Sequence, residues 1–254
     1  ASSYLKCHHP EVFAAALVNS QPMGFYRPHT ILHDAARHGV ELRPLDVNRS
    51  HWDCTLEPPM LGGDGPRALR MGLRLVKGLQ AKLAARLIEA REAVGPFRDM
   101  DALVARTACP AHGLFKLAIA GALDGLILEE GLETRQRRVR AIWSAHRFYG
   151  DERGILARTP AETRLPAFPG MGRADRLVTE HHHAGTAMDT HPMDLIRPWL
   201  KEHRYLDSKT VKQTPSGRRI RTAGLVIVRQ RPPTAGGMLF VTLEDEKGFV
   251  DLVV

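Results

Sequence analysis

The clearest chemical pattern in the sequence lies in residues 74–91, "RLVKGLQAKLAARLIEAR". Gly78 permits a tight reversal between an apolar run and a segment whose leucines recur at helical spacing. Such a turn leaves the first N–H groups of the next helix free, and the positive end of the helix dipole favours an anion there. Because Lys77 and Lys82 add positive charge beside the turn, the pattern predicts a phosphate-binding hairpin.

The same periodicity also fits an ordinary helical hairpin, in which the glycine is only a turn and the charges form a solvated face. A second helical unit follows, with Pro110 at a helix start and Gly121 as a C-cap, so the pattern indicates two hairpins in tandem. The whole chain has 36 Lys and Arg against 28 Asp and Glu. This excess suits a polyanionic partner but does not identify one.

Other groups of reactive side chains have simpler interpretations. His181, His182 and His183 are consecutive, so on a helix they point about 100° apart and cannot all face one metal ion. The three cysteines lie far apart and form no CxxC pair, which fits a reducing, cytoplasmic compartment. "LKCHHP" has no recognisable partner base for a cysteine nucleophile. We therefore predict no metal ligands and no catalytic residues.

Two further segments contain weaker signals for binding. "RLPAFPG", residues 164–170, resembles the short peptides that dock on sliding clamps, although an incidental apolar pair in a linker fits better. Near the C-terminus, Arg229 and Arg231 accompany Phe240 in a strand pattern, which could supply charge and stacking for single-stranded nucleic acid. Phe240 fits a core position equally well.

Helical periodicity and helix start and stop residues predict most of the elements that would position these groups. Residues 40–57 read as extended, with Pro44 opposing a helix, and residues 67–130 read as a helical block. From 218 onward the period changes to that of strands. The predicted helices cover 10–20, 28–39, 80–93, 97–106, 109–121, 132–148, 176–186 and 191–203.

Longer stretches resemble a known family. "LKCHHP", "NSQPMGFY" and "DVNRSHWDCTLE" closely resemble the end of the fingers region of the bacterial C-family replicative polymerases, DNA polymerase III alpha-like subunits, in their error-prone branch. "RMGLRLVKGLQAKLAARLIEAREAVGPFRDMDALVAR" is similar to their tandem helix-hairpin-helix, and "RTAGLVIVRQRPPTAGGMLFVTLEDEKGFVDLVV" to the first three of five strands of their OB domain. The order is collinear with the family.

The resemblance implies a C-terminal fragment of an error-prone, DNA-directed DNA polymerase that acts in damage-induced translesion synthesis. Its two metal ions, Mg²⁺, would bind palm carboxylates upstream of this chain, so no cofactor is expected in the fragment itself. The implied partners are template-primer DNA, a sliding clamp and an accessory translesion polymerase-like protein, with no membrane and a nucleoid-associated location. The alternative is a stand-alone helix-hairpin-helix/OB adaptor of repair without catalysis.

We therefore expect a mainly α chain followed by a partial all-β OB domain, α+β overall. The expected domains are 1–57 (end of fingers), 58–66 (linker), 67–130 (tandem helix-hairpin-helix), 131–217 (helical connector) and 218–254 (three OB strands). One departure from the family is Gln80, where the hairpin usually has a second glycine, and its side chain could crowd a phosphate. The expected DNA-binding residues are Lys77, Gly78, Leu79, Gln80, Lys82, Arg86, Arg229 and Arg231.

Overall fold

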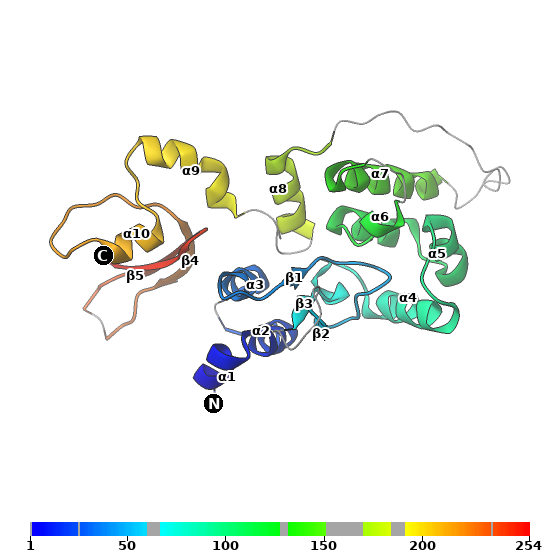
Figure 1. Cartoon of the computed structure of the whole chain (residues 1–254), viewed down its shortest axis with the longest axis horizontal. Coiled ribbons are helices and arrows are strands. Elements are labelled where there is room, and N and C mark those ends of the chain that lie inside the picture. Colours follow the sequence, from blue (N-terminus) through cyan, green and yellow to red (C-terminus); the bar gives the residue numbers. More distant parts are fainter. Residues whose placement is uncertain are drawn as a thin grey trace. The chain divides into compact units, whose positions relative to one another are not determined.

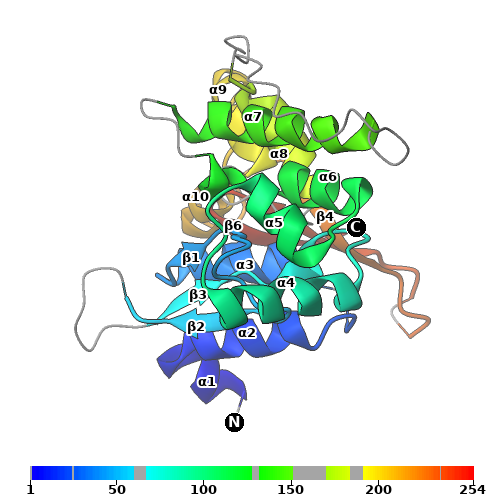
Figure 2. The same cartoon turned by 90° about the vertical axis from the view of Figure 1, so that its right-hand side faces the viewer.

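The computed structural model describes residues 2–24, 26–59, 67–127, 132–150, 170–183, 191–234 and 236–254. The chain divides into two compact units (Figures 1 and 2). One unit is residues 42–186, and the other combines residues 1–41 with residues 187–254. The clamp-like peptide at 164–170 lies outside the described residues, except for Gly170.

The unit 42–186 begins with a small mixed sheet of strands β1 (Leu42–Arg43), β2 (Thr55–Glu57) and β3 (Ala68–Arg70). The order is β1-β3-β2, with β1 parallel and β2 antiparallel to β3. The expectation of a helical block from residue 67 is therefore wrong for its first residues. Because β2 and β3 pair, the sheet also joins segments on both sides of the linker expected at 58–66, and the domain boundaries stay predictions.

A buried ion-pair cluster stabilises this sheet. The Arg70 guanidinium is 5% exposed, and its Nε and Nη2 donate to the two oxygens of Glu57, both at 2.9 Å. Arg43 donates to Glu57 at 2.6 Å. The two arginines lower the pKa of the Glu57 carboxyl to about 2, Arg70 having the larger effect. The cluster therefore needs Glu57 ionised.

The helices of this unit follow the sequence pattern closely. They are α4 (Ala81–Val94), α5 (Met100–Thr107), α6 (Ala111–Ala120), α7 (Thr134–His146) and α8 (Arg173–His183), with short 3-10 turns at Leu73–Leu75, Asp124–Leu126 and Arg147–Gly150. Gly121 ends α6 in the left-handed conformation, as its predicted C-cap role requires. In both views α6 lies beside α7 (Figures 1 and 2).

Arg138 on α7 connects three of these helices to one another. It is 4% exposed, binds both oxygens of Asp124 at 2.9 Å, and donates to the Ile119 carbonyl at 3.1 Å. It also lies 3.3 Å from Glu180 of α8. Arg138 therefore has a structural role within the arginine-rich segment of α7.

The other unit combines helices from both ends of the chain with the C-terminal strands. Helices α1 (Ser2–His8), α2 (Pro10–Asn19), α3 (Pro28–Arg37), α9 (Pro192–Glu202) and α10 (Ser208–Gln213) accompany strands β4 (Leu225–Gln230), β5 (Phe240–Asp245) and β6 (Gly248–Val253). The strands form an antiparallel sheet in the order β4-β5-β6. The expected fold class, mainly α with a C-terminal three-stranded sheet, is confirmed. Its assignment as an OB domain stays a prediction.

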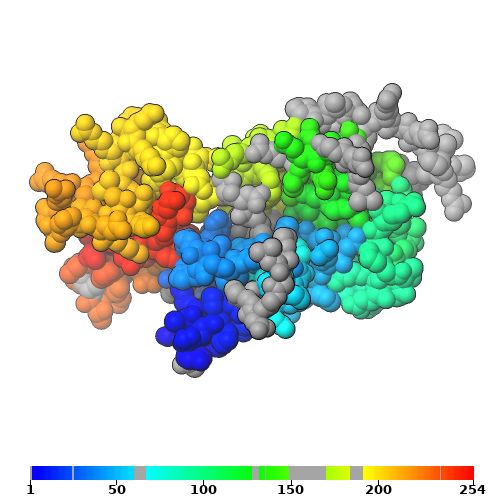
Figure 3. Space-filling view, in the orientation of Figure 1, coloured from blue at the N-terminus to red at the C-terminus, as the bar shows by residue number. Residues whose placement is uncertain are grey.

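Buried charges join the sheet of this unit to its helices. Asp245 accepts hydrogen bonds from the Ser208 hydroxyl and backbone N–H at 2.5 and 2.7 Å, and it lies 3.3 Å from Arg197 of α9. Glu244 accepts from Thr30 of α3 at 3.2 Å. In the space-filling view the yellow and orange surfaces of α9 and α10 adjoin the red surface of the last strand (Figure 3).

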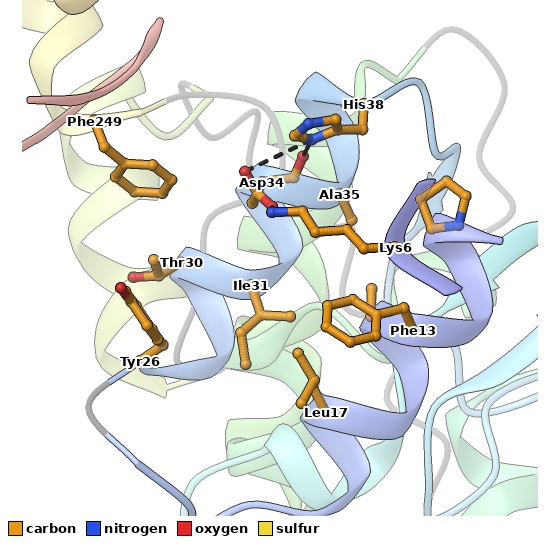
Figure 4. A pocket seen from close by; sticks show the side chains of 12 residues that line it. Lys6, Phe13, Leu17, Tyr26, Thr30, Ile31, Asp34, Ala35, His38 and Phe249 are labelled. Atoms are coloured by element: carbon orange, nitrogen blue, oxygen red, sulfur yellow. Dashed lines mark hydrogen bonds and ion pairs between the residues drawn. The ribbon is translucent and has the colours of Figure 1, made fainter. Parts of the chain in front are cut away.

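The same unit contains a hollow of about 370 Å³ between α2, α3 and β6. Phe13, Leu17 and Ile31 line its interior, and the ion pair between Lys6 and Asp34, at 2.9 Å, lies at its edge (Figure 4). The lining is mostly apolar, and its one carboxylate already has partners. The hollow therefore offers packing surface and no set of groups for phosphodiester chemistry.

Candidate nucleic-acid interface

The first turns of α4 and α6 meet at one hollow of about 240 Å³, which we call the hairpin hollow. These two helices are the second helices of the two predicted hairpins, so the tandem arrangement brings equivalent ends together. The hollow is lined by Gly78, Leu79, Gln80, Lys82, Leu83, Arg86, Pro110, His112, Gly113 and Lys116.

Both helix starts at the hairpin hollow lack a side-chain cap. Gln80 precedes α4 and Pro110 precedes α6, and neither side chain accepts a hydrogen bond from the first turn. By contrast, Asp99 caps α5 through the Ala102 N–H at 2.8 Å. Uncapped first-turn N–H groups are donors that need an acceptor, and a phosphate oxygen is one that the helix dipole favours.

A lysine from the second hairpin joins the two turns. Lys116 Nζ donates to the Gly78 carbonyl at 2.7 Å. Gly78 has φ +74°, a conformation that side-chain-bearing residues rarely adopt. A Cβ at Gly78 would also lie 3.2 Å from Lys116 Nζ. The backbone angle therefore favours glycine at this position, whereas the flexible end of Lys116 could move aside for a Cβ.

Gly113 allows α4 and α6 to pack closely beneath the hollow. A Cβ at this position would lie 2.7 Å from Leu83 Cδ2 and 3.2 Å from Cys109 Sγ. Burial raises the pKa of the Cys109 thiol to about 12, so the sulfur acts as a small packed group and not as a nucleophile. A larger side chain at Gly113 would therefore have to displace Leu83 of α4.

The predicted residues of the first hairpin take different positions. Lys82 and Gln80 are exposed and line the hollow, and Lys77 is exposed beside it, with its backbone N–H donating to the His183 carbonyl at 2.7 Å. Leu79 is 8% exposed, so its side chain belongs to the core and only its backbone can meet a ligand. Gln80 has φ −81° and ψ 136°, which any residue adopts, so the backbone does not need glycine there.

The guanidinium of Arg86 is already engaged. Its Nη2 donates to the carbonyl of Thr107 and, at 2.8 Å, to that of Ala108. These carbonyls end α5, where Ala108 has the left-handed φ of 46°. Arg86 therefore stabilises the turn between the hairpins, and it is not among the phosphate contacts that we propose.

The remaining predicted residues lie in the other compact unit. Arg229 is an exposed residue of β4, and Arg231 is exposed just after it. They belong to residues 187–254, whereas the hairpin hollow belongs to residues 42–186.

Sequence reasoning missed the contribution of the second hairpin, above all Lys116 and His112. The start of α6 at Pro110 was predicted, and the polar side chains of His112 and Lys116 in the first two turns of that helix were a usable signal. Their convergence with Gly78 depends on tertiary packing, because Lys116 and Gly78 are 38 residues apart.

The histidine-rich segment offers no metal site in the part that the structure describes. No three His, Cys, Asp or Glu side chains among the described residues come together as metal ligands. His191 instead begins α9, where its Nδ1 accepts from the Met193 N–H at 3.1 Å, and burial lowers its pKa to about 4. The Mg²⁺ ions implied for the whole polymerase therefore find no ligand set among these residues. Within the same described ranges, no helix is long and apolar enough to cross a membrane.

The fold and the hollow define a helix-hairpin-helix region, and a family model described as helix-hairpin-helix motif matches residues 39–135. An error-prone DNA polymerase of Alkalilimnicola ehrlichii is 46% identical over 255 residues, covering all of this chain and 23% of that protein. Error-prone DNA polymerases of Methylococcus capsulatus and Pseudomonas aeruginosa are each 41% identical, again over the whole chain, which covers 25% and 24% of them.

These similarities confirm the family predicted from the sequence. Over all of its length, this chain is homologous to a segment of error-prone DNA polymerases. It spans about a quarter of the length of these relatives.

Proposed function

We propose that this chain is the DNA-gripping region of an error-prone, DNA-directed DNA polymerase and holds duplex template-primer DNA by its backbone. The observation that carries the proposal is the convergence of two uncapped helix starts with Lys82 and Lys116 at one hollow. A phosphate oxygen placed there would accept from first-turn N–H groups while the lysines offset its charge. Lys77, exposed beside the hollow, would add to this field.

We assign nucleotidyl transfer to the palm of the whole polymerase, beyond this segment. The name that the relatives share, error-prone DNA polymerase, supports this division. A role in damage-induced translesion synthesis, contacts with a sliding clamp and an accessory polymerase-like protein, single-strand binding by an OB domain, and a cytoplasmic, nucleoid-associated location extend the same proposal. The whole-chain similarity favours this function over that of a stand-alone repair adaptor.

Backbone recognition predicts binding without sequence preference. Fluorescence anisotropy with two labelled duplexes of unrelated sequence and equal length should give dissociation constants within about twofold of each other, because phosphates carry no direct sequence information. In a parallel primer-extension assay with Mg²⁺ and all four nucleotides, the chain should give no product above a mock preparation. Strong discrimination between the duplexes, or extension by the chain alone, would contradict the proposal.

A further inference from the structure

The end of α9 presents a stack of aromatic rings at the surface. Trp199 is 53% exposed, although tryptophan is usually largely buried. The His203 ring lies 4.1 Å from the Trp199 ring, centroid to centroid, at an interplanar angle of 26°. The Tyr205 ring lies 6.3 Å from Trp199 at 24°. The His203 and Tyr205 rings are thus each inclined by about a quarter of a right angle to the Trp199 ring, and the tryptophan keeps half of its surface in solvent.

The turn that ends α9 fixes this arrangement. The Tyr205 N–H donates to the Leu200 carbonyl at 2.8 Å, and the Arg204 N–H donates to the Lys201 carbonyl at 3.0 Å. His203 Nδ1 lies 2.9 Å from the Trp199 carbonyl oxygen. This hydrogen-bonding pattern brings the chain back over the last helical turn and places Tyr205 beside Trp199. The rings are therefore ordered before any ligand arrives.

Arg204 occupies the position in this turn where glycine is usual. Its φ is 59°, one of two positive φ values among the described residues other than glycine. A side chain in this left-handed conformation destabilises the fold relative to glycine. Arg204 is exposed, so its charge lies in solvent beside His203 and Tyr205 in the chain.

Positive charge is concentrated in the part of the chain that follows Trp199. Residues 201–221 contain seven Lys and Arg against two Asp and Glu, a net charge of +5 in 21 residues, where the whole chain has +8. Arg204 is exposed and lies between His203 and Tyr205 in the chain, whereas Lys201 is exposed on α9 two residues after Trp199, a spacing that places the two side chains on different faces of the helix. A ligand for this surface should therefore combine a flat apolar ring with a chain of negative charges.

We propose that Trp199, with His203 and Tyr205, forms a stacking site for a base of single-stranded nucleic acid, whose phosphates meet Arg204. Aromatic rings within a basic surface are the usual means of binding single strands without sequence preference, because every base has a π-face. The bases of a duplex stack on one another and cannot stack on this surface. The site does not depend on the hairpin hollow and lies outside strands β4–β6.

Binding of a labelled oligodeoxythymidine, followed by anisotropy, tests the site. Trp199→Ala should weaken binding by roughly 5- to 100-fold, and Trp199→Phe should restore most of it, since stacking contributes on this scale per base. Trp143→Ala is the matched control, because Trp143 is 49% exposed on α7 and should leave affinity unchanged. Oligouridine as a second probe shows whether RNA is bound as well as DNA.

Two further comparisons separate stacking from charge and from folding. An abasic strand of equal length should bind the parent and Trp199→Ala equally, because it offers phosphates without rings. Arg204→Gly should bind oligodeoxythymidine more weakly while resisting urea better than the parent, because glycine relieves the left-handed strain. Duplex affinity should stay the same in Trp199→Ala, so failure of this site and failure of the hairpin grip are distinguishable.

The proposal is overturned if Trp199→Ala and the parent bind oligodeoxythymidine equally, or if Trp143→Ala loses as much affinity. Unchanged single-strand binding together with altered self-association would show that the rings are a protein contact instead.

Discussion

At the scale of single residues, the basic side chains that line the hairpin hollow have different hydrogen-bond partners and therefore different roles. Lys82 and Lys116 face it, and Lys116 also holds the Gly78 carbonyl at 2.7 Å. Arg86 lines the hollow, and its Nη2 donates to two carbonyl oxygens at the end of α5. The sequence shows only that these residues are basic, whereas their partners follow from packing.

Glu57 provides a test of the buried ion pairs through pH. Its pKa is about 2 in the folded chain against an ordinary 4.5, so it stabilises the fold above about pH 4.5, and this contribution is lost as pH falls toward 2. The carboxylate is one-fifth exposed, so we discount the shift for solvent screening and expect Glu57→Gln to lower the free energy of unfolding by about 2 kcal/mol at pH 7. Urea unfolding at pH 7 and pH 3 measures this difference.

The difference between parent and Glu57→Gln should fall by roughly half or more at pH 3, because Glu57 is then protonated in the unfolded chain, whereas in the folded chain it stays mostly ionised. Glu89→Gln, on the exposed face of α4, is the matched control and should change stability by less than about 0.5 kcal/mol at both pH values. If Glu57→Gln lowered the free energy of unfolding by the same amount at pH 7 and pH 3, the ionisation of Glu57 would make no contribution to stability.

At the scale of elements, most helices and the extended character of residues 40–57 could be predicted, whereas α1, α10 and the pairing of the first sheet could not. Amphipathic spacing and residues such as Gly95 and Gly121 mark where α4 and α6 end, and this information is local in sequence. Strands β1 and β3 are two and three residues long and pair Leu42 with Leu69, far along the chain. No strand period can be recognised in so few residues, so only the folded chain identifies them.

The contact between α4 and α6 predicts a coupling between two residues. Gly113→Ala should destabilise the chain by about 1–2 kcal/mol, because the added methyl meets Leu83 Cδ2 and outweighs the gain in helix propensity. Leu83→Ala should cost about 2–4 kcal/mol through the cavity that it leaves. In the double variant, the methyl added at position 113 occupies space that the Leu83 side chain leaves. The loss of stability should therefore be smaller than the sum of the losses of the two single variants.

Urea unfolding of the parent, both single variants and the double variant measures this coupling. We expect a favourable interaction of about 0.5–2 kcal/mol, within the range for residues in contact. Strict additivity would mean that the two helices do not approach as closely as the Gly113 position indicates.

At the scale of the whole molecule, the motifs predicted the family, the mainly helical composition and the C-terminal antiparallel strands. The expected DNA-binding residues fall in both compact units, Lys77 and Lys82 in one and Arg229 and Arg231 in the other. The surface around Trp199 was not predicted, because its meaning depends on the left-handed turn at Arg204 that brings the rings together. Hydrophobic periodicity does not reveal a left-handed turn, and the usual sequence signal of one, a glycine, is missing at Arg204.

If phosphate contacts at the hairpin hollow hold duplex DNA, the affinity for duplex DNA should depend strongly on salt concentration. The logarithm of the association constant should fall with the logarithm of salt concentration with a slope of roughly −2 to −5 for the parent. Lys77→Ala with Lys82→Ala should reduce the magnitude of this slope by about 1–2 and weaken unrelated duplexes alike.

Arg49→Ala with Arg98→Ala removes the same charge from two exposed positions of the same compact unit outside the hollow, and should leave the slope within about 0.5 of the parent. If the lysine variant kept the parent's slope and affinity, or if the arginine control lost as much, the hollow would be a structural turn and would not be the site that holds duplex DNA.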